Sequence, residues 1–131
     1  MLYGKYKDFY NSVSETIEKK RIFTDPLYTL AYGTDASFYR LIPKIIIRAR
    51  DEAEVAAVIK DCSRMNIPVT FRAAGTSLSG QAVTDSVLLV AGNDWKRYTI
   101  EDDGKYIKLQ PGLTGGKVNK YLFKYGRKIG P

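Results

Sequence analysis

The segment 72–81 has a composition suited to binding phosphate. It reads Arg-Ala-Ala-Gly-Thr-Ser-Leu-Ser-Gly-Gln, so almost every residue is small or hydroxylated. Gly75 and Gly80 can adopt positive φ, which lets consecutive backbone N–H groups point at phosphate oxygens. The hydroxyl groups within the segment add further donors, on Thr76, Ser77 and Ser79. The pattern predicts a loop that cradles a diphosphate.

Two well-known phosphate loops do not match this segment. A Walker loop needs Gly-Lys followed by Ser or Thr, whereas Gly80 precedes Gln81, and Gly116-Lys117 precedes Val118. The three glycines of the dinucleotide-binding fingerprint are also absent. On composition alone, a tight and solvent-exposed connection explains the segment equally well.

The elements around the loop predict a parallel βαβ unit. Residues 44–48 contain three consecutive isoleucines, typical of a strand buried on both faces. Asp51, with Glu54 three residues later, predicts the start of a helix whose buried side includes Cys62. Residues 68–71 form a second short apolar strand and residues 87–90 a third.

The two ends of the chain predict more helices and a hairpin. Apolar spacing predicts an amphipathic helix over about residues 5–20, and Asp25-Pro26 predicts a short helix over 26–32, followed by a loop through Arg40. Asp103-Gly104 favours a type I′ hairpin turn, and a last helix is predicted between Thr114 and Gly126. The fold class is therefore α+β: a short parallel sheet flanked by helices, then a hairpin and a helix.

Composition excludes several classes of function. The chain has 131 residues, no His and one Cys, which excludes a Ser-His-Asp triad, a His-containing zinc site and an intramolecular disulfide. Its length allows one domain with a substantial core. No apolar run approaches the roughly 20 residues that span a bilayer. These features predict a cytoplasmic protein, which could also lie peripherally at the membrane through the basic cluster 19–21.

The net charge of +7 is unevenly distributed. Residues 1–50 carry nine bases and five acids, residues 51–95 three and six, and residues 96–131 nine and three. Such charge could favour a polyanion, although basic runs are usually solvated surface. A basic nucleic-acid-binding module and a non-catalytic interaction domain are therefore alternatives. Aromatic and basic residues do not alternate as in a base-stacking strand, which argues against nucleic acid as a partner.

Four features of the sequence together resemble a known family. They are the strand-helix-strand order, the segment 72–81, Gln110-Pro111-Gly112 and the closing Ile129-Gly130-Pro131. They are similar to the FAD-binding domain of FAD-linked oxidases of the vanillyl-alcohol oxidase type, in the branch of D-lactate dehydrogenase and glycolate oxidase. The resemblance covers about residues 25–131, with residues 1–24 expected to form a helical extension. It implies a partial FAD-binding domain.

The resemblance also implies site residues. The FAD pyrophosphate would be held mainly by backbone N–H groups of the loop, with Pro111-Gly112 and Gly130-Pro131 near the cofactor. The implied loop residues are Arg72, Ala73, Ala74, Gly75, Thr76, Ser77, Leu78, Ser79, Gly80 and Gln81. The family often has glycines at Ala73 and Ala74, and some relatives place a flavin-linking His at Thr76. The Thr implies noncovalent FAD.

The family further implies a larger flavoenzyme. The whole protein would oxidise a 2-hydroxy acid such as D-lactate and pass electrons to a quinone or cytochrome. The substrate domain is not recognisable in this sequence, which implies that the chain is an N-terminal part and is inactive alone. Uncovered strand edges and apolar faces would favour self-association.

Overall fold

The structure of the chain is a computed structural model that describes residues 2–130. The polypeptide divides into two compact units, one ending at Gly92 and the other beginning at Asn93. The boundary expected at residue 24 stays a prediction.

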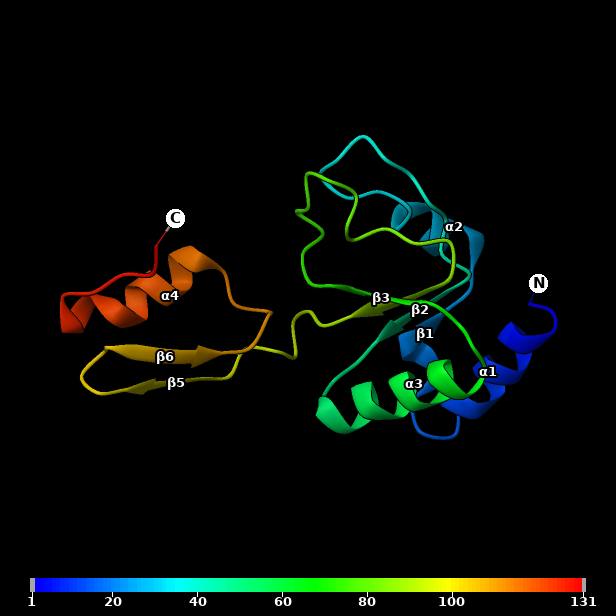
Figure 1. The fold of residues 1–131 in the computed structure, drawn as a ribbon, viewed down its shortest axis with the longest axis horizontal. Coiled ribbons are helices and arrows are strands. Elements are labelled where there is room, and N and C mark those ends of the chain that lie inside the picture. Colours follow the sequence, from blue (N-terminus) through cyan, green and yellow to red (C-terminus); the bar gives the residue numbers. More distant parts are fainter. Residues whose placement is uncertain (1, 131) are drawn as a thin grey trace. The chain divides into compact units, whose positions relative to one another are not determined.

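A four-stranded sheet forms the centre of the first unit (Figure 1), with the strand order β1-β2-β4-β3. Strand β4 lies between β2 and β3 and runs parallel to both, whereas the short β1 is antiparallel to β2. The predicted parallel βαβ unit is therefore confirmed, with the third strand inserted between the first two. The strands are β1 (Ile22–Phe23), β2 (Ile45–Arg48), β3 (Val69–Arg72) and β4 (Val87–Val90).

Burial of the β-branched and leucine side chains explains why β2 and β4 occupy the middle of the sheet. All four residues of β4 and the three isoleucines of β2 are buried. On one face, Ile46, Leu88 and Val90 form a cluster against Phe23 and Tyr32. Because side chains alternate along a strand, their neighbours in sequence form the core on the other face.

Helices α1 (Lys5–Val13) and α3 (Glu52–Arg64) lie side by side along the sheet (Figure 1). The Ser12 hydroxyl donates to the Asp61 carboxylate at 2.6 Å and joins the two helices. The predicted cap of α3 is confirmed, because the Asp51 carboxylate accepts the Glu54 N–H at 3.0 Å. The short helix α2 (Pro26–Ala31) begins as predicted, with the Asp25 carboxylate accepting the Leu27 N–H.

The predicted helix over residues 5–20 is wrong beyond Val13. The chain leaves the helix there and forms the 3₁₀ helix η1 (Lys19–Arg21) before β1. Two long-range contacts favour this path: β1 pairs with β2, and Arg21 binds Glu54. Ile17 remains buried without belonging to the helix. The apolar periodicity therefore predicts which side chains are buried, but it does not predict where the helix ends.

Cys62 is buried in the core, as its place on the apolar side of the helix predicts. Burial raises the pKa of its thiol to about 11, with a smaller contribution from the nearby Asp61 carboxylate. We expect iodoacetamide to alkylate the native chain at least about 100-fold more slowly than the unfolded chain at mildly alkaline pH, since the thiolate is the reactive species. A Cys62→Ser/Ser63→Cys variant, with its thiol at an exposed position, is the control. Equal rates for native wild type and control would contradict this burial.

The second unit consists of a hairpin and a helix. Strands β5 (Tyr98–Glu101) and β6 (Tyr106–Leu109) are antiparallel, and α4 (Gly115–Leu122) continues into the 3₁₀ helix η2 (Phe123–Tyr125). The Tyr98 and Tyr121 rings stack at 4.1 Å between hairpin and helix. The predicted type I′ turn is confirmed, because Asp103 and Gly104 both have positive φ and the Lys105 N–H donates to the Asp102 carbonyl.

Candidate functional site

The loop 73–81 follows the carboxyl end of β3 in the parallel sheet of the first unit. This edge of an open parallel sheet is where such folds commonly bind ligands. The loop returns to the core at Ala82 and Val83, which are buried. Leu78 at the middle of the loop is 77% exposed, so the loop presents its backbone and side chains to solvent.

Two glycines give the loop its shape. Gly75 and Gly80 have φ of +74° and +73°, a region that residues with a Cβ rarely adopt. A Cβ on Gly75 would lie 2.4 Å from Nη2 of Arg72, and one on Gly80 would lie 2.8 Å from the Tyr39 ring. Both positions therefore favour glycine for conformation, and a Cβ there would also displace the Arg72 guanidinium or the Tyr39 ring.

Backbone donors remain available inside the loop. In the part from Gly75 to Gly80, five backbone N–H groups have no acceptor among the described residues: those of Gly75, Thr76, Ser77, Leu78 and Gly80. The N–H groups of Ser79 and Gln81 are occupied instead, because both donate to the Ser77 hydroxyl, at 3.2 and 3.1 Å. Five free donors between two glycines of positive φ form an arrangement that fits a polyanionic group.

Arg72 lies at the base of the loop, where its guanidinium binds backbone carbonyls. Its Nη1 donates to the carbonyl of Thr34 at 2.7 Å and to that of Tyr32 at 3.2 Å. Its guanidinium also lies 5.2 Å from the centre of the Tyr32 ring. In this structure Arg72 ties the base of the loop to the segment after α2, and its predicted contact with a cofactor stays a prediction.

The segment 34–39 supports the loop, although its sequence predicts only a connection. The Asp35 carboxylate accepts the N–H of Ser37 at 2.8 Å and that of Ala82 at 3.4 Å, while the Ala36 N–H donates to the Gly75 carbonyl at 3.0 Å. Figure 1 shows this segment running beside the loop. The Ser37 hydroxyl bound to Asp35 lowers the pKa of that carboxyl, with smaller help from the Ser37 and Ala82 N–H groups. The Asp-x-Ser pattern at 35–37 predicts a local turn. It does not predict that this turn contacts the loop at Gly75 and Ala82.

Replacing Asp35 with alanine tests this support. We expect Asp35→Ala to weaken binding of FAD or ADP to the chain severalfold, because the carboxylate that holds the Ala82 N–H at the end of the loop is lost. Binding is measured by calorimetric titration. Asp8→Ala removes an exposed carboxylate of α1 and is the charge-matched control. Affinities that are the same in both variants would show that Asp35 does not position the loop.

The other predicted cofactor residues belong to the second unit or lie at its end. The Gly112 N–H donates to the Trp95 carbonyl at 2.8 Å, and Pro111 precedes it on the exposed connection after β6. Gly130 is exposed, and Pro131 lies outside the described residues. The structure thus gathers the loop 73–81 in one unit, and the roles expected for these remaining residues stay predictions.

Across residues 2–130, no group of three or more His, Cys, Asp and Glu residues could hold a metal ion. The same residues contain no helix long and apolar enough to cross a membrane.

The sequence from residue 43 to residue 131 matches the family described as "FAD binding domain". The chain belongs to this family. The FAD-binding domain is 34% identical over 97 residues to glycolate oxidase subunit GlcD of Escherichia coli (strain K12), covering 72% of this chain and 19% of the relative. It is 24% identical over 106 residues to D-2-hydroxyglutarate dehydrogenase of the same strain, covering 78% and 10%. The resemblance inferred from the loop and its flanking strands is confirmed.

Solved structures agree on the fold. The domain is similar to alkyldihydroxyacetonephosphate synthase, with a TM-score of 0.75 and 14% identity, covering 96% of this chain and 26% of that protein. A p-cresol methylhydroxylase structure with substrate bound gives a TM-score of 0.73 at the same identity and coverage. The predicted α+β class is thus confirmed. The chain spans about a quarter of these proteins and a fifth or less of the curated relatives.

The residues present fit the cofactor that the family implies. FAD carries a pyrophosphate, and among the described residues the loop offers backbone N–H groups without acceptors between two glycines of positive φ. The hydroxyls of Thr76 and Ser79 have no hydrogen-bond partner among the described residues and can add two donors.

Proposed function

We propose that the chain is the FAD-binding part of a flavin-dependent oxidoreductase that oxidises a 2-hydroxy acid of the D-lactate type. Support for the substrate class comes from the names of the relatives. They are a glycolate oxidase subunit, D-2-hydroxyglutarate dehydrogenases, and a D-lactate dehydrogenase of Archaeoglobus fulgidus that is 25% identical over 88 residues. Each of these names refers to a 2-hydroxy acid.

One observation carries the proposed role of this chain: five backbone N–H groups from Gly75 to Gly80 have no acceptor within residues 2–130. We assign the FAD pyrophosphate to residues 73–81, with the N–H groups as main donors and the hydroxyls of Thr76 and Ser79 beside them. The donors are held in place before binding by the Ser77 hydroxyl and by Asp35. When bound, the flavin supplies the two-electron acceptor for oxidation of the hydroxy acid.

We place the remaining steps in polypeptide that corresponds to the additional length of the relatives. Binding of the hydroxy acid, removal of its proton and transfer of electrons to a quinone or cytochrome belong there. The chain contributes cofactor placement and is expected to be inactive alone. We propose a cytoplasmic location for the catalytic assembly.

FAD is proposed to be held noncovalently. The chain contains no His, and the thiol of its single Cys is buried with a raised pKa, so neither of these common flavin-linking nucleophiles is available. Acid precipitation of the FAD-loaded chain tests this point. All flavin is expected in the supernatant, and flavin that stays with the washed pellet would contradict noncovalent binding.

A further inference from the structure

The helical segment of the second unit carries an unusual concentration of positive charge. Residues 115–128 contain five cations, Lys117, Lys120, Lys124, Arg127 and Lys128, and no acid. All five side chains are exposed. Within residues 2–130, none of them forms an ion pair with a carboxylate.

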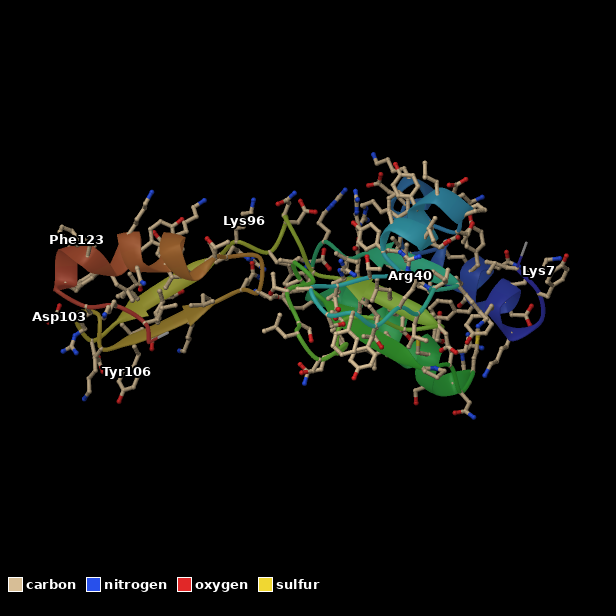
Figure 2. All side chains as sticks on the ribbon, turned by 90° about the horizontal axis from the view of Figure 1, so that it is seen from above. Lys7, Arg40, Lys96, Asp103, Tyr106 and Phe123 are labelled. Atoms are coloured by element: carbon tan, nitrogen blue, oxygen red, sulfur yellow. The ribbon has the colours of Figure 1, made fainter. Side chains whose placement is uncertain are left out.

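An exposed aromatic ring lies among these cations. The buried side of the helix is defined by Val118 and Leu122, four residues apart, and by Tyr121 against Tyr98. Residues 120, 123 and 124 therefore project from the opposite side. Phe123 is 83% exposed, and Figure 2 shows it on the helix side of the unit, with Tyr106 on the hairpin side. We call Lys120, Phe123 and Lys124 the basic-aromatic face.

The basic cluster near the N-terminus is different, although the sequence suggested it as a membrane contact. Lys20 pairs with Glu18 at 2.6 Å, and Arg21 pairs with Glu54. Its charge is partly neutralised within the first unit. The basic-aromatic face has no such neutralisation.

We propose that the basic-aromatic face docks on an anionic lipid bilayer, with the Phe123 ring at the level of the headgroups and the cations on lipid phosphates. Lys and Arg side chains attract anionic lipid headgroups, and an exposed aromatic ring adds apolar area that can enter the boundary between headgroups and acyl chains. The negative charge of the lipid headgroups attracts the five cations of residues 115–128, which form no ion pair within residues 2–130. A protruding ring also suits a bilayer, which needs no matching pocket, better than it suits a rigid protein surface. This inference does not depend on the proposed oxidation of a hydroxy acid.

A pocket at the end of the same helix adds room for a headgroup. It has a volume of about 350 Å³ and lies between the hairpin turn and the end of the helix. Lys105, Arg127 and Lys128 line it together with the backbone of Gly104 and Gly126. A lipid phosphate placed there would meet three cations and no acidic side chain.

Sedimentation of the 131-residue chain with vesicles tests the proposal. We expect binding to vesicles of phosphatidylcholine mixed with phosphatidylglycerol and none to phosphatidylcholine alone. Phe123→Ser should lower the partition coefficient about tenfold, since most of the transfer free energy of one aromatic ring is lost. Lys120→Gln/Lys124→Gln should lower it about 25-fold, at roughly fivefold for each cation near the surface. Far-UV circular dichroism verifies that each variant is folded.

Two matched controls distinguish this face from general adsorption. Leu27→Ser changes a side chain that is 73% exposed on α2, a helix without Lys or Arg, and Lys7→Gln/Lys60→Gln removes two exposed cations from the first unit. Both should bind anionic vesicles like wild type. Absence of binding by wild type, or equal losses in the control and test variants, would overturn the proposal. A Phe123→Trp variant should show a blue-shifted emission on anionic vesicles, and an unshifted spectrum would also count against it.

Discussion

Gly75→Val should abolish measurable FAD binding while the sheet of the first unit remains folded. The valine would need a φ of +74°, which costs a residue with a Cβ about 1–2 kcal/mol. Its Cβ would also meet the Arg72 guanidinium at 2.4 Å. Relief of that contact displaces Arg72 from the carbonyls of Tyr32 and Thr34 and redirects the N–H groups that follow. We expect at least a 100-fold loss of FAD affinity, about 2.7 kcal/mol.

Titration calorimetry with FAD measures this loss, and urea unfolding verifies the fold. Gly116→Val is the matched control, because a Cβ there meets nothing within 4 Å and no positive φ is required. This control should bind FAD like wild type. If Gly75→Val unfolds instead, Gly75→Ala under the same titration provides the milder change. Wild-type affinity in a folded Gly75 variant would show that the loop does not hold the cofactor.

Glu54→Gln should destabilise the chain by about 3 kcal/mol, the usual cost of leaving one partner of a buried ion pair without its counter-charge. The Glu54 carboxylate accepts from both terminal nitrogens of Arg21 at 2.6 Å, and the two side chains are only 12% and 11% exposed. It also accepts the Arg50 N–H at 2.8 Å. The pair thus connects α3 to the segment before β1. Urea unfolding at neutral pH measures the change.

The same pair predicts how stability depends on pH. Hydrogen bonding to Arg21 lowers the pKa of Glu54 from its usual 4.5, against an opposing effect of burial. A carboxyl with a lower pKa in the folded state stabilises the fold fully above the unfolded pKa and loses that contribution as pH falls through the folded value. Wild type should therefore lose its advantage over Glu54→Gln below pH 4.5.

Glu18→Gln is the control for this behaviour, because Glu18 pairs with Lys20 and Arg50 on the exposed surface. Its effect should be much smaller, since solvent screens exposed ion pairs. A Glu54→Gln variant that unfolds at the urea concentration of wild type, at every pH, would rule out a stabilising role for the pair.

Local chemistry explains which parts of the fold could be predicted from sequence. The three isoleucines of β2, the Asp51 cap of α3 and the Asp103-Gly104 turn each depend on a few consecutive residues. Strand β1 and the end of α1 could not be predicted, because they are set by pairing with β2 and by the contact between Arg21 and Glu54. Such contacts join residues more than twenty positions apart and override apolar periodicity.

In the candidate site too, features set by local residue preferences could be predicted from the sequence, and features set by long-range contacts could not. Gly75 and Gly80 could be recognised from the sequence, since positive φ has a strong residue preference. The support from Asp35 could not, because its partner Ala82 lies 47 residues away. Nor does the sequence predict that the Ser77 hydroxyl accepts hydrogen bonds from the N–H groups of Ser79 and Gln81.

The most direct test of the central claim is a titration of the chain with FAD, followed by flavin fluorescence, with ADP and riboflavin as competitors. ADP contains the pyrophosphate that the loop is proposed to hold, whereas riboflavin contains only the isoalloxazine and ribityl groups. We predict saturable FAD binding that ADP displaces and riboflavin barely affects. Absence of saturable binding, or displacement by riboflavin and not by ADP, would contradict the assignment of the pyrophosphate to residues 73–81.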